Sequence, residues 1–182
     1  MPDYLLVDNH LLADSYLSVD NYLSVDNYLS ADSYLPHAAP MVLLEKVINV
    51  SSDHVHCQVT VSNEGVLSPF LNAEGHMPSW FAIEIMAQAI GVWSGWHRKK
   101  RKEEDSALGM LLGGRAVRCL APVFTQDSVL DIQMNLLLQD EKVGSFEGSI
   151  CCNGTVLATG RLNTYQPDKT ELKKLFQRDG VA

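Results

Sequence analysis

Glu84 is the residue of this 182-residue chain that is most clearly able to take part in a reaction, because it lies inside an almost wholly apolar run. That run, from Trp80 to Trp96, favours a helix without a polar face, which other elements must bury. Burying an unpaired carboxylate costs on the order of several kcal/mol. Glu84 is therefore either the anchor of a structural hydrogen bond or a working acid. Gln88 follows one turn later, where its side chain can hold the carboxylate.

Segments with strand patterns flank this helix on both sides. Residues 129–139 alternate cleanly between apolar and polar side chains, which is typical of a half-buried strand. Asn153 and Gly154 form the strongest hairpin signal in the chain. Ser79 is the expected N-cap of the helix. We expect strands at 41–50, 54–61, 110–119, 129–139, 144–152 and 156–165, and the helix at 80–101.

The order of two strands, one long buried helix and four strands predicts an α+β fold. A helix that is apolar on all sides needs an antiparallel sheet of about six strands to wrap round it, which is the hot-dog fold. This domain is expected to span residues 35–182. It ends in a short helix, which a capping box of Asp168 and Glu171 opens.

Residues 1–34 form a separate arm with an internal repeat. Tyrosines recur at a six-residue spacing, at positions 4, 16, 22, 28 and 34, and each unit carries an aspartate. A six-residue period fits neither a helix nor a helical supercoil. The arm is acidic and lacks lysine and arginine, so we expect it to be disordered, with a functional repeat as the alternative.

The composition excludes several function classes. The formal net charge of −8 gives a nucleic-acid role no electrostatic support. The cysteines lack the spacing of metal ligands, so we expect neither a metal nor a cofactor. We see no signal peptide, and Glu84 and Gln88 interrupt the longest apolar run, which argues against a membrane span. A cytoplasmic protein is expected.

Two stretches resemble a known family. Residues 35–40 read Leu-Pro-His-Ala-Ala-Pro, and residues 77–88 place Glu84 six residues after Pro78 and end in Met-Ala-Gln. Both stretches are similar to the hot-dog 3-hydroxyacyl-ACP dehydratases of fatty-acid synthesis, where ACP is the acyl carrier protein. The residues around Trp80 look closer still to the dehydratase-like proteins of aryl-polyene biosynthesis clusters. The resemblance covers about residues 35–165.

The resemblance implies a reaction and a set of site residues. A 3-hydroxyacyl-ACP thioester loses a C2 proton to a base, while an acid protonates the leaving C3 hydroxyl, and enoyl-ACP results. Glu84 matches the acid position. The family's base is an upstream histidine, but residues 69–75 contain none, so His76 becomes the candidate base. Gln88, Gly75 and Trp80 are the expected substrate-binding residues, and His37 is interpreted as a structural residue.

The helix ends in a basic run, residues 97–102. One interpretation is a solvated terminus whose charges suit the helix dipole. The other is a docking site for the acidic carrier protein. Under the second interpretation, the carrier-binding residues are Arg98, Lys99, Lys100 and Arg101.

Three functions remain open at this point. The first is a lyase that dehydrates 3-hydroxyacyl-ACP in fatty-acid or aryl-polyene synthesis. The second is a weakly active or non-catalytic hot-dog subunit that pairs with an active dehydratase, which the missing upstream histidine favours. The third is an acyl thioesterase in which Glu84 activates water. All three predict a homodimer or a heterodimer, because a single curled sheet leaves open edges.

Overall fold

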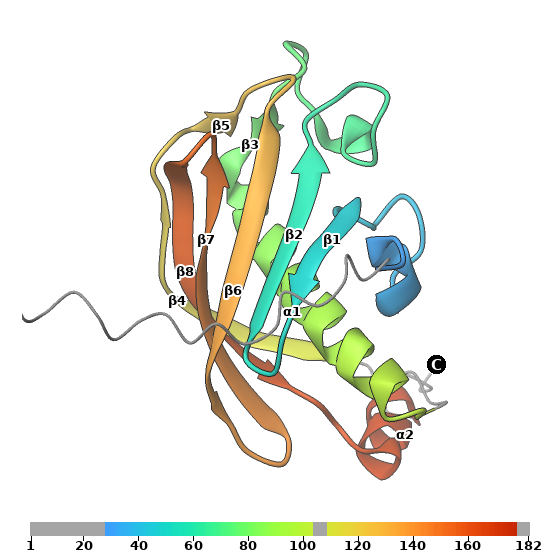
Figure 1. The fold of residues 1–182 in the computed structure, drawn as a ribbon. Coiled ribbons are helices and arrows are strands. Elements are labelled where there is room, and N and C mark those ends of the chain that lie inside the picture. Colours follow the sequence, from blue (N-terminus) through green and yellow to red (C-terminus); the bar gives the residue numbers. More distant parts are fainter. Residues whose placement is uncertain (1–27, 104–108, 178–182) are drawn as a thin grey trace, which may run out of the picture.

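The computed structural model of the chain describes residues 28–103 and 109–177. One long helix, α1 (Ala82–Lys100), lies in the hollow of a curled antiparallel sheet (Figure 1). This arrangement confirms the predicted hot-dog fold. The six strands are, in their order across the sheet, β1 (Lys46–Val50), β2 (His54–Thr60), β6 (Val129–Gln139), β7 (Val143–Cys152), β8 (Thr155–Tyr165) and β4 (Met110–Cys119).

Alternating side chains explain why the sheet buries one face against α1. In β2, Val55, Cys57 and Val59 are buried, and the polar residues between them are half-buried on the other face. The neighbouring strand β6 repeats the pattern, and Cys57 pairs with Ile132. Because successive side chains of a strand point to opposite faces, these residues meet α1 and form the core.

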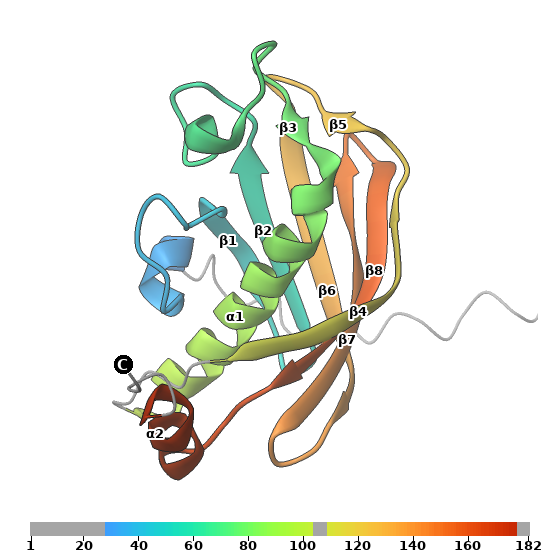
Figure 2. The same cartoon turned by 180° about the vertical axis from the view of Figure 1, so that it is seen from behind.

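β4 is the exposed edge of the sheet. It pairs with β8 alone among the described strands, and Figure 2 shows it crossing beside α1. A bulge at Ala116, which has a φ of 52°, shifts the register of the strand. Its apolar residues Met110, Leu111 and Leu112 remain exposed. A long unpaired edge with apolar side chains is suited to pairing with another chain.

The entry into α1 differs from the expectation. A short pair of strands, β3 (Met77–Pro78) and β5 (Val123–Phe124), is followed by a 3-10 turn, η3 (Ser79–Phe81). Ser79 is buried, its side chain makes no capping bond, and its N–H donates to the carbonyl of Pro122 at 3.2 Å. The predicted N-cap is therefore wrong, because the pairing of β3 with β5 draws Ser79 inward before the helix begins.

The end of the repeated arm belongs to the packed domain. The N–H of Val50 donates to the hydroxyl of Tyr28 at 3.2 Å, and Ala31 and Tyr34 are buried in the short 3-10 helix η1 (Ala31–Tyr34). The packed domain therefore begins before residue 35, where the boundary between arm and domain was predicted. The contacts of these side chains with distant segments cannot be recognised from a local sequence pattern. The rest of the predicted arm, residues 1–27, lies outside the described residues.

The C-terminal helix α2 (Lys169–Gln177) begins as predicted. The N–H of Glu171 donates to Asp168 at 2.9 Å, and the N–H of Asp168 donates back to the Glu171 carboxylate at 2.9 Å. Lys142 joins both carboxylates, at 2.7 and 2.9 Å, and so ties α2 to the start of β7. None of the described helices is long and apolar enough to span a membrane.

Candidate active site

Glu84 lies near the start of α1 with its carboxylate held by Gln88. The Gln88 amide nitrogen donates to Glu84 Oε1 at 2.9 Å and to the carbonyl of Met41 at 2.8 Å. The Gln88 amide oxygen accepts the N–H of Leu43 at 2.8 Å. Gln88 is buried, and its two backbone partners determine which way its amide faces. The nitrogen is therefore directed at the acid.

The Glu84 side chain is not sealed in the core. It is 38% exposed, because its face of α1 borders a cavity rather than the packed sheet. His37 lines the same cavity, and its Nε2 is 3.8 Å from Glu84 Oε1. The sequence interpretation treated His37 as structural. The structure brings it beside the acid at the mouth of the cavity.

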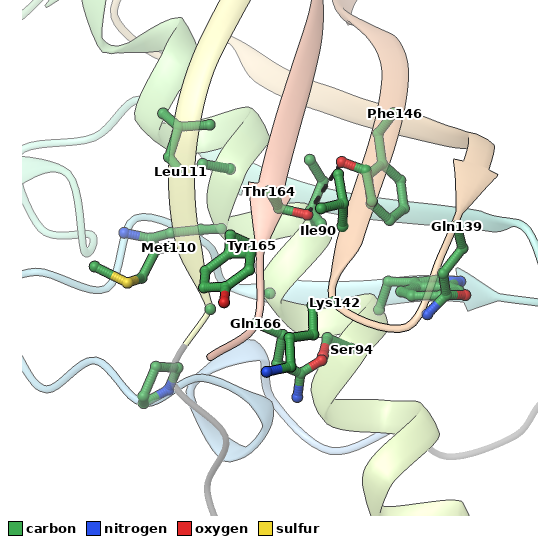
Figure 3. Close-up of a pocket in the computed structure, with 18 of the residues that line it drawn as sticks. Ile90, Ser94, Met110, Leu111, Gln139, Lys142, Phe146, Thr164, Tyr165 and Gln166 are labelled. Atoms are coloured by element: carbon green, nitrogen blue, oxygen red, sulfur yellow. Dashed lines mark hydrogen bonds between the residues drawn. The ribbon is translucent and has the colours of Figure 1, made fainter. Parts of the chain in front are cut away.

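The cavity has a volume of about 210 Å³ and follows α1 from Glu84 to Arg98. These positions are 14 residues apart, which corresponds to roughly 21 Å of helix. In Figure 3 the side chains of Ile90, Phe146 and Thr164 lie together between α1 and the sheet. Glu84 and His37 line one end of the cavity, apolar residues such as Ile90 and Phe146 belong to its wall, and Arg98 and Lys142 are part of the lining as well. A cavity with reacting groups at one end and an apolar stretch beside them fits an acyl chain attached to a reacting head group.

His76 lies in the turn before β3, away from the cavity lining. Its N–H donates to the Asn72 side chain at 2.8 Å, and its ring Nδ1 accepts the N–H of Gln126 at 3.1 Å. Gly75 beside it has a φ of 78°, a left-handed conformation that suits glycine. Neither residue is among those that line the cavity of Glu84. The structure does not bring this pair together with the acid.

Trp80 is also separate from the cavity. It is 69% exposed, and its ring stacks on Phe81 with centroids 6.3 Å apart. The thiol of Cys119 donates to the Ser79 carbonyl at 3.2 Å, which places the end of β4 beside this turn. The exposed Trp80 ring thus lies near the unpaired edge of the sheet.

The four basic residues at the end of α1 do not form one exposed patch. Arg98 is only 9% exposed and lines the cavity, and burial lowers the pKa of its guanidinium. Arg101 pairs with Glu103 at 2.6 Å. The ammonium groups of Lys99 and Lys100 lie over the rings of Tyr34 and Trp96, at 5.7 and 4.8 Å. Arg98 therefore differs from the other three basic residues, because its helix face turns toward the cavity.

Comparison with known proteins finds similarity over most of the chain. A family model described as ApeP dehydratase, ApeP-like, matches residues 29–177. A solved chain from the dehydratase heterocomplex ApeI:P of Xenorhabdus doucetiae is 80% identical, with a TM-score of 0.78. The similarity covers 82% of this chain and 98% of that chain.

Other similarities are shorter or more distant. The 3-hydroxyacyl-(acyl-carrier-protein) dehydratase FabZ of Streptococcus pyogenes is 39% identical over 64 residues, which are 32% of this chain and 42% of that relative. The chain thus matches less than half the length of this curated relative. A hypothetical thioesterase of Streptococcus pneumoniae is 15% identical, with a TM-score of 0.51 over 67% of this chain and 84% of that chain, and indicates the fold alone.

Proposed function

Because the chain belongs to the ApeP-like dehydratase family, we propose that it dehydrates 3-hydroxyacyl-ACP thioesters to enoyl-ACP in fatty-acid or aryl-polyene synthesis. The observation that carries this proposal is the Glu84–Gln88 pair, which lines a cavity along α1. The family relationship agrees with the resemblance found in the sequence. The reaction needs an acid that donates its proton to the leaving C3 hydroxyl.

The hydrogen bond from Gln88 suits Glu84 to this acid role. Gln88 donates to Oε1, while Oε2 makes no hydrogen bond within the described part of the chain. In a protonated carboxyl group, one oxygen accepts hydrogen bonds and the other carries the proton. Gln88 thus occupies the accepting oxygen and leaves the second oxygen to hold the proton for the substrate. Gln88 is a positioning residue in this proposal.

The base remains a separate assignment. His76 is the candidate base that the sequence provides, but its ring Nδ1 accepts a hydrogen bond from the backbone N–H of Gln126. Gly75 and Trp80, which precede α1 in the chain, remain proposed substrate contacts. Of the two, the exposed Trp80 ring is the better placed to contact a substrate that is bound to its carrier protein.

A second hot-dog chain is the proposed partner. The ApeI:P structure is a heterocomplex of dehydratases. The unpaired edge of β4, with Met110, Leu111 and Leu112 exposed, offers a surface on which such a chain can extend the sheet. A homodimer would use the same edge.

The acyl carrier protein is the other proposed partner. Lys99, Lys100 and Arg101 are exposed at the end of α1 and supply the positive charge for an acidic carrier, without the buried Arg98. We place this carrier-dependent reaction in the cytoplasm.

A weakly active or non-catalytic subunit is the second candidate function. One specific observation favours it, which is that residues 69–75 contain no histidine at the place where related dehydratases carry their base. In that case the chain supplies Glu84 and the cavity, and an active partner supplies the base.

One assay separates these functions. The purified protein is given a 3-hydroxyacyl-ACP, alone and with a partner dehydratase, and enoyl-ACP and free thiol are measured. We expect Glu84→Gln to reduce enoyl formation about 100-fold or more, since general acid catalysis contributes roughly that much. Glu64→Gln, an exposed carboxylate outside the cavity lining, is the matched control and should retain full activity.

Four outcomes decide between these functions. Enoyl product from the protein alone supports the enzyme, and product that requires the partner supports the subunit. Thiol release without enoyl product indicates a thioesterase. Unchanged activity of the Glu84→Gln variant rejects the acid assignment and with it the proposed chemistry.

A further inference from the structure

A histidine other than His76 is already present at the acid. His37 Nε2 lies 3.8 Å from Glu84 Oε1, and both side chains are slightly more than one-third exposed, at 36% and 38%. A substrate in the cavity can therefore reach both. His76, in contrast, is absent from the cavity lining, and its Nδ1 is occupied by the N–H of Gln126.

The loop that carries His37 is tied to α1 on both sides of the histidine. On the N-terminal side, Leu35 packs on α1, where a Cβ at Gly91 would lie 2.8 Å from the Leu35 methyl group. On the C-terminal side, Met41 and Leu43 both bind the amide of Gln88. Gln88 also binds Glu84, so a single side chain positions the acid and the loop of the histidine together.

From this geometry we propose that His37 is the catalytic base, an assignment that rests on the proposed dehydratase function. His37 Nε2 takes the proton from C2 of the 3-hydroxyacyl thioester. The C–H electron pair forms the C2–C3 double bond, the C3–O bond breaks, and the hydroxyl leaves as water with the proton of Glu84. His37 then carries a proton and Glu84 is ionised.

The short distance between the two groups also completes the cycle. The proton on His37 Nε2 returns to the Glu84 carboxylate, whose Oε1 is 3.8 Å away, directly or through one water molecule. Acid and base regain their starting forms, and no other reactant is consumed. The pair thus supplies both proton transfers of the reaction from one chain.

The test compares variants of three histidines in the complex with the partner dehydratase. We expect His37→Ala and His37→Gln to lower kcat about 100-fold or more, with KM changed less than threefold, because only proton transfer is lost. His76→Ala should retain kcat within twofold. His54→Ala is the matched control, because His54 lies on the outer face of β2, where it bonds Asn135.

A pH profile separates catalysis from structure. If His37 is the base, the wild-type kcat falls at low pH as the base is protonated, and the residual activity of His37→Gln lacks this fall. A circular-dichroism melt checks that both His37 variants are folded, and the glutamine variant remains informative if the alanine variant is not.

Each contrary result has a defined meaning. Full activity of both His37 variants, together with an inactive Glu84→Gln, overturns the assignment of His37 and leaves the dehydratase function intact, with the base supplied by the partner. Loss of kcat in His76→Ala alone makes His76 the base. An active Glu84→Gln rejects the proposed function itself.

Discussion

The two halves of α1 are buried by different kinds of contact. In the first half, Glu84 borders a cavity and Gln88 is held by backbone groups of the segment before β1. In the second half, Gly91 and Gly95 allow the N-terminal segment to lie directly on the helix. The first half therefore holds its polar groups beside open space, whereas the second half, although Ser94 and Arg98 still line the cavity, is in direct contact with the N-terminal segment at both glycines.

Aromatic side chains add further contacts to the second half. The indole N–H of Trp93 donates to the Ser51 carbonyl at 3.2 Å, and His97 Nε2 donates to the same oxygen at 3.0 Å. A carbonyl only accepts hydrogen bonds, so the ring of His97 carries its proton on Nε2. These contacts anchor α1 to the turn between β1 and β2. Firm anchoring at this half lets the other half present an acid at a defined place while a cavity stays open beside it.

Gly95→Ala is expected to give the largest loss of stability. A Cβ at this position would lie 2.1 Å from the Tyr34 carbonyl oxygen, a backbone atom that cannot rotate away. We expect the free energy of unfolding to fall by about 3 kcal/mol or more, since overpacking forces the backbone to shift. Urea denaturation measures this value.

Gly91→Ala is the matched control on the same helix face. There the new Cβ would meet a methyl group of Leu35 at 2.8 Å, and this flexible side chain can move. Alanine also gains about 1 kcal/mol of helix propensity over glycine, so the net change should be within about 1 kcal/mol. Equal losses for the two variants would contradict the close backbone contact at Gly95.

Gln88→Ala tests the first half of α1 and should have the second-largest effect on stability. The buried N–H of Leu43 loses its acceptor, and we expect a loss of about 2 kcal/mol in the free energy of unfolding. Dehydration should slow as well, because the Gln88 amide no longer binds both Glu84 and the loop of His37.

Ser94→Ala provides the comparison for this variant. Ser94 lies on the same helix and also lines the cavity, yet it does not contact Glu84 in the described structure. We expect nearly unchanged stability and enoyl formation. If Gln88→Ala retained both as well, the amide of Gln88 would have no positioning role.

The sequence predicted the parts of the fold that local patterns determine. Alternation in residues 129–139 marked β6, and the apolar run around Glu84 marked the central helix, so the hot-dog fold was confirmed. The capping box of Asp168 and Glu171 was confirmed because its bonds lie within one turn. Each of these signals lies within a few neighbouring residues.

Contacts between distant segments were not predictable in the same way. His37 meets Glu84 across 47 positions of sequence, and nothing near Pro36 or His37 indicates that contact. Tyr28 and Tyr34 read as two more units of a repeat, but their packing partners belong to other elements. Arg98 was grouped with the basic run at the end of the helix, whereas the rotation of its helix face decides its burial.

Substitution of His97 is expected to have the smallest effect on the free energy of unfolding, and this effect appears only as a dependence on pH. Burial lowers the pKa of His97 below its ordinary value of 6.5, an effect that the Ser51 hydrogen bond opposes and the nearby Arg101 and Lys100 reinforce. As the pH falls through 6.5, the unfolded chain takes up this proton more readily than the folded chain. The free energy of unfolding contributed by His97 is therefore fully present above this pH and declines below it.

The informative quantity is the difference in unfolding free energy between wild type and His97→Gln. Glutamine can donate to the Ser51 carbonyl but does not titrate. Urea denaturation at pH 7.5, 6.5 and 5.5 should show a steeper fall in unfolding free energy for the wild type than for the variant. Parallel slopes would mean that His97 takes up its proton in the folded chain without breaking its contact with Ser51. The second half of α1 would then be less tightly packed around His97 than its contacts indicate, and its contrast with the first half would rest on Gly95 alone.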